Sequence, residues 1–174
     1  MPFIDDDPFE MEEPEEGKPE RAEELEQRPD RGEVRPREVK VVGVFEYEAA
    51  HDYFVLLRDS HGRQLPIQIG PFEAHSIYMV LQGEQPPRPL THDLFKTVIE
   101  RLGAKIDSLT IDDLFHSTYY AKLALQVKDG ILDIDTRPSD GIALALRAGA
   151  PIYVAESVLD EAEKHTEGEE EELE

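Results

Sequence analysis

Two hydrophobic periods follow one another along this chain, and their order limits the folds that it can adopt. Between residues 39 and 70, apolar and β-branched residues recur with the two-residue period of strands. From Pro71 to Gly83 they recur with the 3.6-residue period of a helix, and both patterns return further along the chain. A block of strands followed by helices and more strands predicts an α+β domain with a mixed, largely antiparallel sheet. The predicted strands are 39–48, 53–59, 64–70, 104–111, 118–127, 131–136 and 151–155, and the predicted helices are 71–83, 92–102, 140–148 and 157–164.

The charge of the chain is concentrated at its two ends. Forty acidic and 18 basic residues give a formal net charge of −22. Residues 1–38 hold 15 acidic and 6 basic groups, and residues 163–174 hold 7 and 1, with few large apolar side chains in either segment. Such segments bury too little apolar surface to offset the entropy of ordering. We therefore expect one compact domain at 39–162 between disordered acidic tails at 1–38 and 163–174.

The composition excludes several classes of protein. Cysteine is absent, which removes disulfides, thiolate metal sites and cysteine nucleophiles. The chain starts without a basic, apolar signal segment, and no stretch approaches the roughly 18 apolar residues that a membrane helix needs. We expect a cytoplasmic protein with no membrane partner.

The stretch DTRPSDGIALALRAG suggests an anion site at the start of a helix. Pro138 favours the first helical turn, Ser139 or Thr136 can accept a backbone N–H, and Asp140 opposes the positive end of the helix dipole. Helix capping explains all of these residues, but it does not require Arg137. A guanidinium beside free N–H groups at a helix start is an arrangement that holds phosphate. The alternative is structural, with Arg137 paired to a neighbouring aspartate.

A second Arg-Pro helix start has the same kinds of residue. Arg88 precedes Thr91, a candidate N-cap, and His92 and Asp93 follow in the first turn. Histidine titrates near neutral pH, so His92 is a candidate general acid or base. The sequence has no His-Glu-x-x-His motif, no phosphate-binding glycine loop and no Gly-x-Ser-x-Gly motif. The familiar hydrolase signatures are therefore missing.

Pairs of carboxylates offer a third kind of site. Asp133 and Asp135 are two residues apart in a predicted strand, so they face the same side and could bind Mg²⁺ or Mn²⁺ through oxygen. Such a metal would polarise a phosphoryl group and activate water. The alternative is two solvent-facing acids on an edge strand. Glu73, near the start of the helix at 71–83, is a further candidate that the helix dipole explains equally well.

The motifs together resemble a known family. IGPFEA at 69–74, RPLTHD at 88–93 and RPSDGIALAL at 137–146 are similar to the bifunctional nuclease domain family, and the resemblance covers about residues 40–162. Gly141 stands where alanine is common in that family, and glycine there should weaken the helix by up to ~1 kcal/mol. The resemblance implies a compact α+β domain that hydrolyses phosphodiester bonds of RNA and DNA, and a homo-oligomer. The family does not fix the catalytic residues.

For a nuclease, we expect the two Arg-Pro helix starts to form one cleft in which Arg88 and Arg137 hold phosphate. Two further classes of function stay open beside it. The same helix starts could form a non-catalytic regulatory module that binds an anion or a protein, or they could be purely structural. The predicted domain holds 18 acidic and 11 basic residues and has no run of Lys or Arg, so nucleic-acid binding should be weak and sensitive to salt. It would depend on a local cluster of Arg88, Lys96, Arg137 and Arg147. The candidate residues are His92, Asp93 and Asp140 for catalysis, Arg88, Thr91, Arg137 and Ser139 for phosphate, Asp133 and Asp135 for metal, and Glu73 as a further motif position.

Overall fold

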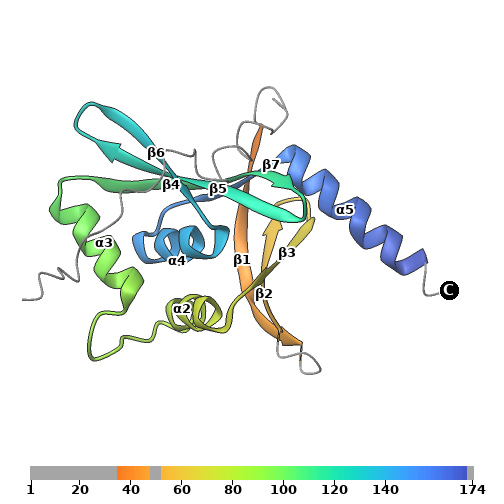
Figure 1. Ribbon diagram of the computed structural model, residues 1–174, viewed down its shortest axis with the longest axis horizontal. Helices are drawn as coiled ribbons and strands as arrows, with labels where there is room; N and C mark the ends of the chain where they lie inside the picture. Colours follow the sequence, from red (N-terminus) through yellow and green to blue (C-terminus); the bar gives the residue numbers. More distant parts are fainter. Residues whose placement is uncertain (1–34, 48–51, 172–174) are drawn as a thin grey trace, which may run out of the picture. The chain divides into compact units, whose positions relative to one another are not determined.

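The computed structural model describes residues 35–47 and 52–171, with side chains as far as Lys164. The described residues form a seven-stranded sheet in the order β3-β2-β1-β7-β4-β5-β6 (Figure 1). The strands are β1 (Pro36–Tyr47), β2 (Asp52–Asp59), β3 (Gln64–Ile69), β4 (Lys105–Phe115), β5 (Thr118–Val127), β6 (Gly130–Thr136) and β7 (Ile152–Ala155). The helices are α2 (Pro71–Leu81), α3 (Thr91–Arg101), α4 (Pro138–Ala148) and α5 (Glu156–Glu171).

The α+β fold class is confirmed, and the sheet is mixed as predicted. β1, β2 and β3 form one antiparallel meander, and β4, β5 and β6 form another. β7 lies between them, antiparallel to β1 and parallel to β4. Pro66 lies in β3, an edge strand of the sheet. Its missing N–H therefore interrupts no hydrogen-bond ladder between central strands.

The core lies between the sheet and α4. Alternate residues of the central strands are buried, as in Leu109 and Ile111 of β4, and nearly every residue from Pro138 to Ala145 in α4 is buried. α4 contacts α2, α3, β4 and β5. Figure 1 shows α2, α3 and α4 gathered on one side of the sheet, with α5 apart from these three helices. The arrangement brings the starts of α2 and α4 close to the sheet.

The apolar stripe of α3 is largely exposed. The sequence predicts an apolar stripe made of Leu94, Phe95, Val98, Ile99 and Leu102, and of these residues only Ile99 is buried. Leu102, just past the end of the helix, is 82% exposed. The stripe is amphipathic as expected, but no described element covers it. The predicted stripe is therefore present, but the sequence did not show that most of it is exposed.

The first residues of three helices differ from the predicted caps. α3 already includes Thr91, so Leu90 is its N-cap and the Leu90 N–H donates to the Asp93 carboxylate. Arg137 itself is the N-cap of α4, and no side chain caps that helix. α5 begins at Glu156, one residue before the predicted cap Ser157. Its helix continues to Glu171, past the predicted end at residue 164.

The predicted tails are covered only in part. Residues 1–34 of the predicted N-terminal tail lie outside the described residues, and β1 already begins at Pro36. Most of the predicted C-terminal tail belongs to α5, and residues 172–174 are not described. Within the described part of the chain, no helix is both long enough and apolar enough to cross a membrane.

Candidate functional site

A cavity of about 560 Å³ lies where α2 and α4 begin. Gly70 and Pro71 from the start of α2, and Arg137, Pro138 and Ser139 from the start of α4, form part of its wall. Neither helix has a side-chain hydrogen bond at its N-cap. The first-turn N–H groups of the two helices are therefore left for water or a ligand, and the positive ends of both dipoles lie beside one cavity. The rest of the wall comes from Asp52, Ile67, Gln68, Ile69, Ser117, Thr118 and Tyr119.

The opposite rim of the cavity is a strained turn. His116 and Ser117 join β4 to β5 with φ values of 47° and 59°, a left-handed backbone conformation that residues other than glycine rarely adopt. Such positions cost on the order of 1 kcal/mol each and persist only where neighbouring structure holds them. The turn presents Ser117 and Thr118 to the cavity. No sequence motif indicated these two hydroxyl groups.

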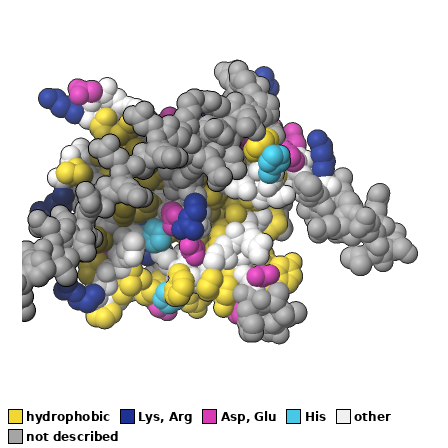
Figure 2. All heavy atoms as spheres, viewed as in Figure 1, with side chains coloured by type: hydrophobic (Ala, Val, Ile, Leu, Met, Phe, Trp, Pro, Cys, Tyr) yellow, Lys and Arg dark blue, Asp and Glu magenta, His cyan; other side chains and the backbone are white. Residues whose placement is uncertain are grey.

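Arg137 lies between two carboxylates at this cavity. Its Nε donates to Asp140 Oδ2 at 2.8 Å, and its Nη2 lies 3.0 Å from Glu73 Oε1 of α2. Its Nη1 has no hydrogen-bond partner among the described residues, and 64% of the side chain is exposed. Figure 2 shows basic, acidic and histidine side chains gathered in the middle of one face of the molecule. Arg137 can thus bind a further anion without leaving its two partners.

The hydrogen-bond network continues from Asp140 into the interior. Asp140 Oδ1 lies 3.1 Å from His92 Nε2, and His92 Nδ1 lies 2.9 Å from the hydroxyl of Ser76. Ser76, on α2, is buried. Both ring nitrogens of His92 are therefore engaged, one by the carboxylate and one by the hydroxyl. The geometry gives His92 a positioning role for Asp140, and its predicted acid–base role remains a prediction.

The charges in the network shift the pKa values of its members. Burial of Asp140 raises its pKa, but hydrogen bonds from Arg137 and His92 and their charges outweigh burial, so the pKa lies below the ordinary value. For Arg137, the hydrogen bond and charge of Asp140 raise the pKa, and burial lowers it by less. Asp140 is consequently an anion, and Arg137 a cation, at neutral pH.

Asp93 belongs to a second ion pair beside this network. Its Oδ1 accepts a hydrogen bond from Arg147 Nε at 2.6 Å, and its Oδ2 accepts the Leu90 N–H at 2.8 Å. Arg147, near the end of α4, is only 6% exposed and also donates to the carbonyl groups of Ser76 and Ala143. Asp93 therefore ties α3 to α4 and lies outside the wall of the cavity described above.

The other predicted phosphate residues divide between two places. Ser139 lines the cavity and is buried, whereas Arg88 and Thr91 are exposed and do not line it. The sequence predicts that the starts of α3 and α4 hold one anion between Arg88 and Arg137. In the structure, the start of α2 is the one that shares a cavity with the start of α4. Chain order and motif similarity could not reveal this pairing.

The predicted metal ligands do not line the cavity. Asp133 and Asp135 are on β6, the far edge strand, opposite Ala124 and Lys122 of β5. They share one side of the strand, as predicted, but no group of three or more His, Asp or Glu side chains within the described residues is arranged to hold a metal ion. Mg²⁺ commonly takes one or two protein carboxylates, and water and substrate phosphates supply its remaining ligands. Metal use stays a prediction, and no step below depends on it.

Sequence reasoning missed Ser76, and it missed the ion pair of Arg147 with Asp93. Ser76 interrupts the apolar side of α2, next to the buried Ile77, and a polar residue there needs a buried partner. Arg147 is a charged residue within a largely apolar helix. Both patterns are visible in the sequence, but neither identifies the partner.

Comparison with known proteins gives a consistent result. The family model described as bifunctional nuclease domain matches residues 55–167. An uncharacterized protein of Mycobacterium tuberculosis is 45% identical over 126 residues, which are 72% of this chain and 75% of that protein. Bifunctional nuclease 1 of Oryza sativa subsp. indica is 29% identical over 62% of this chain and 34% of the rice protein. Bifunctional nuclease 2 of Arabidopsis thaliana is 28% identical over 61% of this chain and 33% of that protein.

Proposed function

Because this chain belongs to the bifunctional nuclease domain family, we propose that it hydrolyses phosphodiester bonds of RNA and DNA at the cavity between the starts of α2 and α4. The observation that carries this proposal is Arg137, whose Nη1 has no hydrogen-bond partner in the described part of the chain and which lies beside two helix starts without side-chain caps. Three sources of positive potential meet there, and a phosphate diester fits such a site.

The residues around Arg137 have distinct roles in the proposal. Arg137 and the first-turn N–H groups hold the phosphate and stabilise the charge that grows on its oxygens in the transition state. Asp140 orients Arg137 and is an ionised carboxylate next to the phosphate position. As the oxygen of the attacking water bonds to phosphorus, Asp140 accepts the proton that the water loses, the bond from phosphorus to the leaving sugar oxygen breaks, and that oxygen takes a proton from solvent. His92 and Ser76 hold Asp140 in place. Because a carboxylate of lowered pKa is a weak base, we expect a slow enzyme.

A cleavage assay tests this proposal. The full chain would be incubated with single-stranded RNA and DNA in Mg²⁺, Mn²⁺ or EDTA. Arg137→Ala and Asp140→Asn would each lower kcat/KM by about 10²-fold or more, since each removes a group that acts in the transition state. Arg101→Ala is the matched control, because Arg101 is an exposed arginine in the last turn of α3. Activity that survives both site variants, with folding unchanged, would contradict the proposal.

A second function has one observation in its favour. Each charged side chain of the network already has an opposite charge beside it, which also suits a non-catalytic module that binds an anion. The same assay separates the two functions. Oligonucleotide binding that depends on Arg137, with no cleavage under any metal condition, would indicate the binding module.

A further inference from the structure

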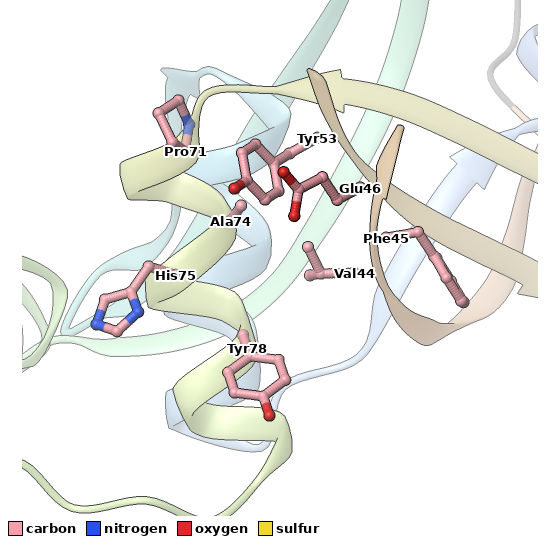
Figure 3. Close-up of a pocket in the computed structure, with 8 residues that line it drawn as sticks. All are labelled: Val44, Phe45, Glu46, Tyr53, Pro71, Ala74, His75 and Tyr78. Carbon is pink, nitrogen blue, oxygen red and sulfur yellow. The ribbon is translucent and has the colours of Figure 1, made fainter. Parts of the chain in front are cut away.

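A smaller cavity of about 290 Å³ lies between α2 and the strands β1 and β2. Its position connects it to the site described above. Pro71 lines both cavities, and the neighbouring residues Asp52 and Tyr53 line one each. The two cavities therefore adjoin at the start of α2. The lining residues are Val44, Phe45, Glu46, Tyr53, Pro71, Ala74, His75 and Tyr78 (Figure 3).

Two tyrosines form opposite walls of this cavity. Figure 3 shows Tyr53 lying over Ala74 on α2, and Tyr78 one helical turn further along the same helix. Ala74 is 2% exposed and has only a methyl group, which leaves room between the rings. Phe45 points to the other face of β1, where it stacks on Phe54 with ring centroids 5.4 Å apart. The aromatic surface that a ligand can reach thus belongs to Tyr53 and Tyr78, of which Tyr78 is 46% exposed.

Glu46 supplies a hydrogen-bond acceptor to this cavity, whereas His75, which also lines it, points away from Glu46 in Figure 3. Glu46 points from β1 toward α2 beside Tyr53, as Figure 3 shows, and its carboxylate hydrogen-bonds to the Tyr53 hydroxyl. A carboxylate has about four lone-pair positions, so Glu46 can accept further N–H groups. It also repels phosphate. The cavity therefore favours a flat, uncharged ring that carries N–H donors, while the cavity beside Arg137 favours an anion.

We propose that this cavity binds one nucleobase, stacked against Tyr53 and Tyr78, while the adjoining phosphate lies at Arg137. The inference rests on the proposed function, because it takes nucleic acid as the substrate, and it adds two properties. The base must be unpaired to enter, so the substrate is single-stranded. Glu46 accepts from an exocyclic amino group, so adenine, cytosine and guanine bind better than thymine or uracil, which have no amino group.

Oligonucleotide binding tests the inference. Fluorescence anisotropy with the full chain in EDTA would compare labelled single strands of deoxyadenylate, of thymidylate and of abasic deoxyribose phosphate. Tyr78→Ala should weaken deoxyadenylate binding about tenfold, as expected for loss of one stacked base, and should leave abasic binding unchanged. Tyr78→Phe should keep the affinity. Glu46→Gln should reduce the preference for deoxyadenylate over thymidylate.

A matched control and the cleavage assay separate the failure modes. Tyr47→Ala removes an exposed tyrosine of β1 that does not line the cavity, and it should leave binding unchanged. If the wild-type chain cleaves RNA or DNA but Tyr78→Ala binds deoxyadenylate as tightly as the wild type, the base site is wrong and the proposed function stands. If Tyr78→Ala weakens binding but the wild type cleaves nothing, the base site stands and the nuclease does not. Equal wild-type affinity for the abasic and deoxyadenylate strands would also overturn the inference.

Discussion

Arg147 lies near the end of α4, and only 6% of its charged side chain is exposed. Its partner Asp93 is 31% exposed, so solvent reaches the carboxylate of the pair but hardly reaches the guanidinium. The same carboxylate also receives the N–H at the start of α3. The Asp93 carboxylate thus stabilises both the contact between two helices and the first turn of one of them.

Removing the charge of Asp93 should therefore destabilise the fold. We expect Asp93→Asn to lower the free energy of unfolding by about 2–3 kcal/mol, because Arg147 would stay buried without a compensating charge. The double variant Asp93→Asn with Arg147→Met should recover part of the loss. Urea unfolding measures both. A loss below about 0.5 kcal/mol for Asp93→Asn would show that the pair contributes little.

The pH dependence of stability follows from Asp93 and Asp140. For both groups burial raises the pKa. Hydrogen bonds and charges, chiefly from Arg147 for Asp93 and from Arg137 for Asp140, lower the pKa by more than burial raises it. A carboxyl group with a lowered folded pKa contributes stability above its unfolded pKa, here 3.8, and loses it as the pH falls through the folded value. The contribution of these two groups to the unfolding free energy should be constant between about pH 5 and 7 and should fall below about pH 4. Asp140→Asn should make that fall less steep.

The pH dependence of cleavage distinguishes Asp140 from His92 as the base. If Asp140 accepts the proton, kcat/KM should stay level from pH 7 down to about pH 5, because this carboxylate remains ionised there. A histidine base would give a different profile, with a rate that falls within this pH range, because imidazoles as a class gain a proton there. A profile of kcat/KM over pH 4–8 for the wild type and Asp140→Asn would decide between them.

At the scale of single residues, the sequence identified several site residues but not their partners. Arg137, Ser139, Asp140 and Glu73 lie at or beside one cavity, and their motifs made them candidates. Ser76 was missed because a serine in an apolar helix face has no signature until its partner is known. Tyr53 and Tyr78 were missed for a similar reason, since an aromatic residue on a strand or helix usually belongs to the core.

At the scale of elements, the close contact of α4 with β4 explains Gly141. A Cβ at this position would lie 2.4 Å from Leu109 Cδ1 and 3.2 Å from Thr136 Cγ2, and Leu109 is fully buried. The sequence suggested only that glycine weakens the helix. In the structure the absence of a side chain lets the helix approach the strand.

Gly141→Ala should therefore destabilise the protein in spite of alanine's higher helix propensity. The gain in propensity is up to ~1 kcal/mol, and overpacking of a core usually costs about 1–3 kcal/mol. We expect Gly141→Ala to lower the unfolding free energy by about 1 kcal/mol relative to the wild type. In a Leu109→Val background the same substitution should lower it by less, relative to Leu109→Val alone, because valine leaves space for the new methyl group. Thermal and urea unfolding of both variants measure this, and a stabilised Gly141→Ala protein would contradict the packing account.

Element types were predictable because their periods are strong, and element partners were not. All seven described strands and four described helices were predicted, with bounds within about four residues except for the end of α5, which lies at Glu171 and not at residue 164. The insertion of β7 between β1 and β4 depends on contacts between segments far apart in the chain, which periodicity does not encode. The amphipathic pattern of α3 likewise predicts an apolar face without showing what covers it.

At the scale of the whole molecule, the formal charge of −22 opposes nucleic acid. Arg137 is the cation that we place on the phosphate, so one or two phosphate contacts are expected. Each neutralised phosphate of a single strand contributes about −0.7 to the slope of log K against log salt concentration. Titrations at several KCl concentrations should give a slope near −1, and a slope steeper than about −4 would indicate a much larger basic interface.

The exposed face of α3 bears on the expected homo-oligomer. Leu94, Phe95, Val98 and Leu102 form an apolar surface of a kind that often marks a protein interface. If the chain self-associates through this face, Leu94→Glu should shift the mass measured by sedimentation equilibrium toward the monomer. Tyr47→Glu, at another exposed apolar residue, is the control. An unchanged oligomer in Leu94→Glu would place the interface elsewhere.

A crystal structure of the chain with a short deoxyadenylate strand tests the central claim most directly. The account predicts a phosphate oxygen within hydrogen-bond distance of Arg137 Nη1 and of first-turn N–H groups of α2 or α4. It predicts no displacement of the bonds from Arg137 to Asp140 and Glu73. A phosphate bound at Arg88 or elsewhere, with Arg137 contacting only its two carboxylates, would contradict the claim.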